Sequence, residues 1–200
     1  SKSYIVAGSV FIKNSVGRSI DTALLDGTFP AKLGDSTQPQ VLIIHTHGSE
    51  AYTMPAGEEY TPSGSYRTAD TEKNMIRVGD EIAAVLSQYG ISVLHDRQIH
   101  DSDYNSAYGK SRSSAAAYLE KYPSLSFVLD IHRDAISDAE GRQYKVVSKE
   151  DPRAAQLSIV MGSNYGAWMD NLRLAAAVQA NLLKEHPTLM RPIILRSYGY

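Results

Sequence analysis

Residues 41–52, VLIIHTHGSEAY, place a run of apolar side chains directly before His-Thr-His-Gly. A nearly continuous apolar run of this length is typical of a strand that is covered on both faces in a parallel sheet. A helix is predicted from about residue 72 to residue 89, because apolar residues recur there at helical spacing. Similar arguments predict helices over 106–122 and 171–186.

Other apolar runs predict strands over residues 3–12, 91–95, 127–132, 144–148 and 157–162. Strands that alternate with helices indicate an α/β fold, a single three-layer domain whose central sheet is mainly parallel (mixed) and flanked by helices. We expect residues 1–40 to form a lead-in strand and linker, and residues 41–200 to form the main domain. Residues 48–70 are rich in Gly, Tyr, Pro and Ser, which predicts a long loop, and loops of that length are usually functional.

The composition excludes several classes of protein. A net charge of −2 gives no basic surface for a polyanion, so we expect no nucleic acid as a partner. The absence of cysteine excludes disulfides and thiolate metal ligands, so a metal site must use His and carboxylates. No run approaches the ~20 apolar residues that cross a bilayer. The chain starts at Ser1 without a signal-like segment, and we expect it to be an excised piece of a longer protein.

Two predicted strands end in histidine, in VLIIHTH and in FVLDIH (127–132). The carboxyl ends of parallel strands meet at one edge of a sheet, where ligands bind. The helix that follows the first strand begins at the same edge, and RTADTEKN supplies Asp70 and Glu72 there. His47, His132 and one of these carboxylates therefore predict a zinc site of the catalytic type, with one position left for water. Zinc would lower the pKa of the bound water and polarise a scissile carbonyl.

Each of these residues also has an ordinary structural interpretation. His45 lies within the strand and is expected to pack or form a hydrogen bond. Asp70 could cap the helix, and Glu72 could favour the helix dipole. His132 could be a loop residue, and Arg133 could pair with a neighbouring aspartate. The pattern alone leaves these alternatives open.

The motifs HTHGSEAY, RTADTEKNMIRVGDEI, IHDSDYNSAYGKSR and VLDIHRD together resemble the stage II sporulation protein P family, a branch of the zinc-dependent N-acetylmuramoyl-L-alanine amidases. The resemblance implies the zinc amidase type of α/β fold, and it implies Zn²⁺ bound by His47, His132 and an acidic residue. In that family the acidic residue stands four positions before an Asn-aliphatic pair. Counting back from Asn74-Met75 implies Asp70, with Glu72 as the alternative.

The resemblance implies hydrolysis of the amide between N-acetylmuramic acid and L-alanine in peptidoglycan, and also of peptide crosslinks. Its setting would be septal wall degradation during engulfment in sporulation, with a lytic transglycosylase (stage II sporulation protein D) as partner. The protein would face the cell wall outside the cytoplasm, anchored to the membrane by a segment not in this chain. The loop 48–70, Arg133 and Asp134 would line a groove for a stem peptide.

One departure from the family pattern leads to an alternative. The general-base Glu of the family lies in a late segment resembling LLIEVG, and RPIILRSYGY ends this chain before any such segment. The resemblance thus implies that the catalytic Glu lies beyond Tyr200. The alternative function is a peptidoglycan-binding module that has the amidase fold and does not cut.

Overall fold

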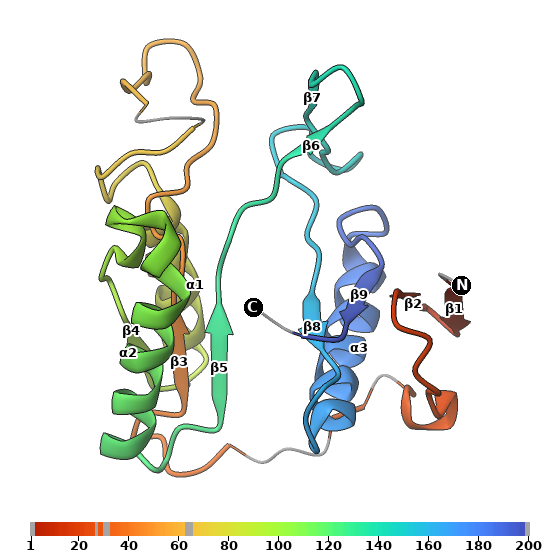
Figure 1. The fold of residues 1–200 in the computed structure, drawn as a ribbon. Coiled ribbons are helices and arrows are strands. Elements are labelled where there is room, and N and C mark those ends of the chain that lie inside the picture. Colours follow the sequence, from red (N-terminus) through yellow and green to blue (C-terminus); the bar gives the residue numbers. More distant parts are fainter. Residues whose placement is uncertain (1–2, 27, 30–32, 63–65, 199–200) are drawn as a thin grey trace. The chain divides into compact units, whose positions relative to one another are not determined.

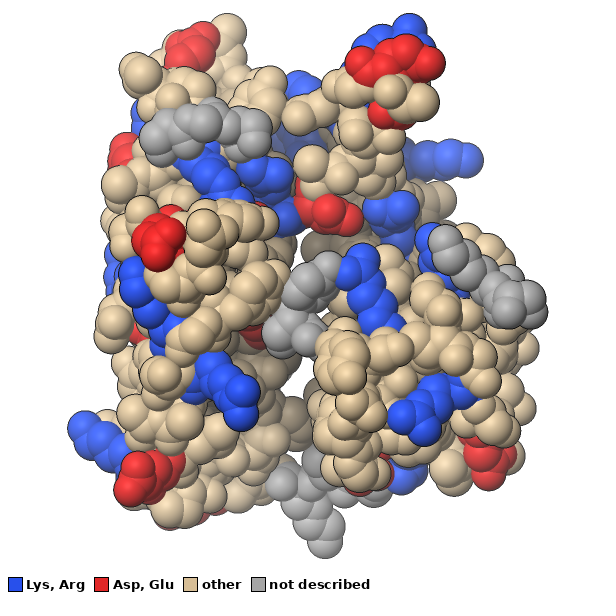
Figure 2. Space-filling view, viewed as in Figure 1, with Lys and Arg blue, Asp and Glu red and all other residues tan. Residues whose placement is uncertain are grey.

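The computed structural model describes residues 3–26, 28–29, 33–62 and 66–198. Contacts along the chain divide it into two compact units. One unit comprises residues 32–134, and the other comprises residues 1–31 together with 135–200. On the face drawn in Figure 2, acidic and basic side chains are interspersed on both units, as the small net charge leads one to expect.

The unit of residues 32–134 is a three-layer α/β sandwich (Figure 1). Its sheet has the strand order β4-β3-β5, with β3 (Val41–Ile44) parallel to both β4 (Val93–His95) and β5 (Phe127–Asp130). The two connecting helices are α1 (Met75–Gln88) and α2 (Ala107–Lys121). Because the chain moves one way from β3 to β4 and back across β3 to β5, right-handed crossovers place these helices on opposite faces. Figure 1 shows α2 in front of the sheet and α1 behind it.

The central strand β3 is buried along its whole length. Its side chains alternate between the two faces, so a central strand with a helix on each side must be apolar at every position. This requirement explains the run VLII, and the strand predicted there is confirmed. Met75 and Ile76 at the start of α1 are also fully buried.

Helix α1 begins later than the sequence pattern predicts. Asn74 is its N-cap, since the Asn74 Oδ1 accepts a hydrogen bond of 2.9 Å from the Ile76 backbone N–H. The helix ends before Gly90, which has φ of +75° in the left-handed region that glycine favours at helix ends. The predicted C-terminal end is confirmed, while residues 72–74 lie outside the helix.

The second unit contains a sheet of order β1-β2-β9-β8. Strands β1 (Ser3–Ala7) and β2 (Val10–Asn14) form an antiparallel hairpin, and β9 (Ile193–Arg196) runs parallel to β2 and to β8 (Val160–Gly162). The prediction of one strand over residues 3–12 is therefore wrong: Gly8, with φ of +60°, turns the chain between two strands. Helix α3 (Trp168–Glu185) packs on this sheet, and the buried core includes Ile12, Leu172, Ala176, Ile193 and Leu195.

The remaining elements are short. Strands β6 (Ile136–Ser137) and β7 (Gln143–Tyr144) form a small hairpin, so the strand predicted over 144–148 is reduced to its first residue. Single 3₁₀ turns are η1 (Thr22–Leu24), η2 (His100–Ser102) and η3 (Tyr104–Ser106). The predicted α/β class, with mainly parallel strands flanked by helices, is confirmed. The proposed division at residues 40 and 41 stays a prediction, and residues 27 and 30–32 of the predicted linker lie outside the described residues.

Helix α1 carries a glycine at its closest approach to the sheet. A Cβ on Gly79 would lie 2.4 Å from the His95 Nε2 and 2.5 Å from the His45 Nε2. The buried ring of His45 and the half-buried ring of His95 contact each other, with 2.8 Å between their Nε2 atoms. The His45 Nδ1 donates to the Ile131 carbonyl at 2.9 Å, so neither ring can move without breaking a contact.

We expect Gly79→Ala to lower the free energy of unfolding by about 1–3 kcal/mol, because overpacking outweighs the better helix propensity of alanine. Gly109→Ala in α2 is the matched control, since a Cβ there meets no atom within 4 Å. That change should raise the stability by about 0.5–1 kcal/mol. Urea unfolding of both variants measures the difference, and equal stability of the two would contradict the tight packing at Gly79.

Candidate metal centre

The candidate site lies at the carboxyl ends of β3 and β5, within the unit of residues 32–134. These strands are neighbours and parallel, with Ile44 paired to Asp130. His47 follows the end of β3, and His132 follows the end of β5. Their rings meet with centroids 5.2 Å apart at an interplanar angle of 73°. The convergence of two strand ends, which the sequence predicts, thus brings the two histidines together.

A tight turn brings a third residue to the same place. The His47 carbonyl accepts a hydrogen bond of 3.1 Å from the Glu50 backbone N–H, so the chain folds back after His-Gly-Ser. The Glu50 carbonyl in turn accepts a hydrogen bond of 2.9 Å from the Met75 backbone N–H. This pairing fixes Glu50 against the start of α1.

His47, Glu50 and His132 form a group that could hold a metal ion. One possible ligand atom from each lies within 4.8 Å of the others. The Glu50 Oε1 is 3.8 Å from the His47 Nδ1, and the Glu50 Oε2 is 3.5 Å from the His132 Nδ1. His47 and Glu50 are buried, and the side chain of His132 is 25 % exposed, so the group is mostly buried and is open to solvent at His132.

Asp130 ties the two strand ends together. Its Oδ1 accepts a hydrogen bond of 2.9 Å from the Thr46 backbone N–H, and its Oδ2 accepts one of 2.6 Å from the Thr46 hydroxyl. The Asp130 Oδ1 also lies 3.0 Å from the His132 Nε2, although these two atoms are not aligned as a hydrogen bond. One carboxylate therefore sets the positions of the residues on both sides of the group.

The two histidines differ in their electrostatics. Burial lowers the pKa of His47, against the attraction of Glu50, so this ring is neutral at pH 7. Burial lowers the pKa of His132, but the nearby carboxylates of Asp130 and Glu50 outweigh burial and raise this pKa to about 9. Among the described residues the buried His47 Nε2 has no hydrogen-bond partner. A neutral, buried, unpaired ring nitrogen is suited to a metal ion.

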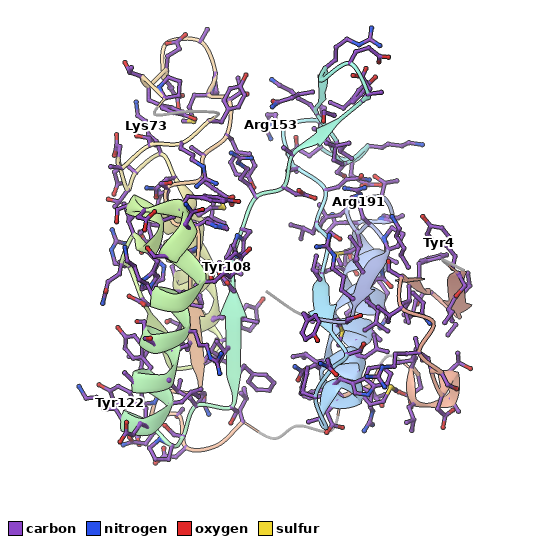
Figure 3. The ribbon with its side chains drawn as sticks, viewed as in Figure 1. Tyr4, Lys73, Tyr108, Tyr122, Arg153 and Arg191 are labelled. Atoms are coloured by element: carbon purple, nitrogen blue, oxygen red, sulfur yellow. The ribbon has the colours of Figure 1, made fainter. Side chains whose placement is uncertain are left out.

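Two tyrosines form one wall of the site. The ring of Tyr104 stacks on His47 with centroids 4.9 Å apart and an interplanar angle of 8°. The ring of Tyr108 meets His47 edge-on at 5.1 Å. In Figure 3, Tyr108 and Tyr122 mark the two ends of α2, and the candidate site lies at the Tyr108 end. Both wall tyrosines are exposed, so this wall of the site also faces solvent.

The structure does not bring Asp70 to this group. The Asp70 side chain is exposed, and its Oδ1 accepts a hydrogen bond of 3.0 Å from the Glu72 backbone N–H. Glu72 is also exposed and lies beside Arg77. The physical reason is that α1 starts at Met75, so residue 70 stays in the loop before the helix. The carboxylate in the group is Glu50, which the sequence reasoning missed although it belongs to the motif HTHGSE. The signal was the spacing His-x-x-Glu from His47 into the start of the predicted loop.

The other predicted residues lie around the group. His45 is buried against His95, and it is not among the three grouped residues. The Arg133 backbone N–H donates to the Glu50 Oε2 at 3.1 Å, and an Arg133 guanidinium nitrogen donates to the Tyr66 carbonyl at 3.2 Å. Asp134 is exposed. Of the predicted long loop, residues 48–62 and 66–70 contain no helix or strand apart from isolated bridges.

The sequence of this chain is similar to that of a known protein family. The family model of stage II sporulation protein P matches residues 13–200. The chain belongs to the stage II sporulation protein P family. A relative from Bacillus subtilis (strain 168), named stage II sporulation protein P, is 23% identical over 173 residues. That alignment covers 80% of this chain and 40% of the relative, so the chain spans well under two thirds of its length.

No solved structure matches the chain. The resemblance stated from HTHGSEAY and VLDIHRD is thus confirmed at the level of the stage II sporulation protein P family, and with it a role in sporulation. Within the described ranges, no helix is both long and apolar enough to span a membrane.

Proposed function

We propose that this chain carries the metal centre of a zinc-dependent peptidoglycan hydrolase that cleaves the amide between N-acetylmuramic acid and L-alanine. The observation that carries the proposal is the group of His47, Glu50 and His132, in which the Nε2 atoms of both histidines are buried without a hydrogen-bond partner among the described residues. Two imidazoles and one carboxylate are a donor set that zinc accepts in hydrolases, with a fourth position for water. Membership of a sporulation family supports a cell-wall substrate.

The three residues would hold the ion, and the ion would supply a water of lowered pKa and a polarised carbonyl. The chain's own residues do the rest. Asp130 orients His132, and the turn at Gly48 holds Glu50 beside His47. Tyr104 and Tyr108 border the open side, where a substrate would enter. Arg133 and Asp134 are the residues we propose to contact a stem peptide; the Arg133 guanidinium suits a peptide carboxylate.

The setting we propose is the septal cell wall outside the cytoplasm, with a lytic transglycosylase acting on the same peptidoglycan. The two activities are chemically complementary, since one cleaves the glycan strand and the other removes its peptides. A second candidate function is a module that binds peptidoglycan without cutting it, since His47, Glu50 and His132 could hold an ion in either case.

Release of stem peptides from purified peptidoglycan tests the hydrolase. The chain loaded with zinc is incubated with peptidoglycan, and new L-alanine amino termini are measured beside sedimentation of the protein with the wall. Release that stops on addition of a chelator supports the hydrolase. Sedimentation without release, by this chain and by the full-length protein, favours the binding module. Failure of the intact chain to bind zinc at neutral pH would refute the metal centre itself.

The raised pKa of His132 predicts that zinc binding strengthens with pH. Below about pH 9 the imidazolium of His132 must lose its proton before the ring can bind the ion. We expect the apparent zinc affinity to rise about tenfold per pH unit between pH 6.5 and 8, with release of roughly one proton per ion. Competition with a chelator at several pH values measures this, and an affinity independent of pH would contradict it.

The stability of the metal-free protein should change in the opposite sense. The folded-state pKa of His132 lies above the ordinary value of 6.5, so its protonation stabilises the fold below pH 6.5 and is lost as the pH rises through about 9. The free energy of unfolding without metal should fall by about 3 kcal/mol over that interval, and His132→Gln should flatten the profile.

A further inference from the structure

Asp101 is a buried carboxylate that lies outside the three grouped residues. It belongs to the turn η2, and its side chain is fully buried. Burying a charge costs free energy unless the charge is paired and hydrogen-bonded, so the partners of Asp101 indicate its structural role. All of the partners that the structure gives it lead towards Glu50.

The partners of Asp101 are Ser49 and Arg67. The Asp101 Oδ1 accepts a hydrogen bond of 3.1 Å from the Ser49 backbone N–H, and its Oδ2 accepts one of 2.5 Å from the Ser49 hydroxyl. The Arg67 Nη1 pairs with the same Oδ2 and donates to the Ser49 hydroxyl at 3.2 Å. Asp101 thus fixes the residue that precedes Glu50 in the turn.

Arg67 also reaches Glu50 directly. Its Nη2 donates to the Glu50 Oε1 at 3.2 Å, and residues 50 and 67 form an isolated backbone bridge. A guanidinium can pair with both oxygens of one carboxylate, and such a pair would occupy Glu50 completely. Here the guanidinium is divided, because Nη1 goes to Asp101 and Nη2 to Glu50.

We propose that Asp101 is a positioning residue of the metal centre: it holds the Ser49 turn and divides the Arg67 guanidinium, so that Glu50 can present a carboxylate oxygen between His47 and His132. This inference rests on the metal centre of the proposed function. Residues that orient metal ligands commonly change the metal affinity by about 10–100-fold when they are replaced.

Asp101→Asn tests the proposal, with Asp96→Asn as the matched control. The Asp96 side chain is as deeply buried as that of Asp101. Its carboxylate likewise accepts from a backbone N–H (Gln98), a serine hydroxyl (Ser114) and a nitrogen-bearing side chain (the His100 ring). Within the described part of the chain, the hydrogen bonds given for the Asp96 side chain are to Gln98, His100 and Ser114, and none is to Ser49, Glu50 or Arg67. We expect Asp101→Asn to raise the zinc dissociation constant about 10–100-fold, and Asp96→Asn to change it by less than about 3-fold. Circular dichroism confirms that both variants are folded.

A second variant distinguishes positioning from a general loss of structure. If Asp101 restrains Arg67, then Arg67→Gln added to Asp101→Asn should recover zinc affinity by about 5-fold or more, because the competing cation is gone. If Asp101→Asn does not fold, Ser49→Ala carries the test, with an expected loss of about 3–10-fold.

The outcomes separate the two proposals. A wild-type chain that binds no zinc overturns the metal centre and this inference together. If the wild type binds zinc, three results overturn the inference alone. They are an unchanged zinc affinity in Asp101→Asn, an equal loss of affinity in Asp96→Asn, and no recovery of affinity in the double variant.

Discussion

Replacing His132 by alanine is expected to lower the zinc affinity about a thousandfold. Protein zinc sites bind with roughly 10–16 kcal/mol, so one of three protein ligands accounts for about 4 kcal/mol, which is ~10³ in the dissociation constant. His132 is only partly buried and emerges after the end of β5, so its removal leaves the strand pairing intact. Competition with a chromophoric chelator at pH 7.5 measures the loss.

His186→Ala is the control for this variant, because His186 is an exposed histidine just after α3. It removes one imidazole from the chain without touching the group, and it should leave zinc affinity within about 2-fold of the wild type. An His132→Ala protein that still bound zinc within about 3-fold of the wild type would show that His132 is not a ligand.

Replacing Glu50 by alanine is expected to lower zinc affinity by about 10²–10³-fold, whereas Asp70→Ala should leave it unchanged within about 2-fold. The difference follows from position: Glu50 is buried beside both histidines, while Asp70 is exposed and satisfies the Glu72 backbone N–H. This pair of variants decides between the carboxylate that the family spacing implies and the one that the fold brings to the site.

Glu50→Ala also leaves two hydrogen-bond donors without their Glu50 acceptor. Arg67 and the Arg133 backbone N–H both donate to the Glu50 carboxylate, so Glu50→Ala removes one acceptor from each. Glu50→Gln keeps one carbonyl acceptor and the side-chain volume, and it should lose zinc affinity with a smaller loss of stability. Zinc binding lost in Asp70→Ala but retained in Glu50→Ala would restore the family-based assignment.

The sequence predicted the parts of this protein that depend on local pattern. The run VLII specifies a strand buried on both faces, and the helical spacing around Met75 and Ile76 specifies α1. His47 and His132 follow because the carboxyl ends of neighbouring parallel strands share an edge of the sheet, which needs no knowledge of distances. The two-sided burial of β3 and the convergence of these histidines are therefore readable from the chain itself.

The remaining features depend on geometry that the pattern does not carry. Glu50 joins the group through a four-residue turn closed by the His47 carbonyl, and its partners come from residues 67 and 133, far along the chain. The helix start moved to Met75 because Asn74, rather than Asp70, caps it. The hairpin at Gly8 was hidden because residues 4–7 and 10–12 are both apolar runs, so only Gly8 and Ser9 marked the turn between them.

The bonds between Asp130 and Thr46 have a consequence for the order of events in assembly. They join the segment that carries His47 to the segment that carries His132 by protein contacts alone. The two histidines can therefore come together before an ion binds. Folding and loading should then be separate steps: the empty protein can reach its final shape first and acquire its ion later. An ion stripped by a chelator should return on simple re-addition, at a rate set by access rather than by refolding.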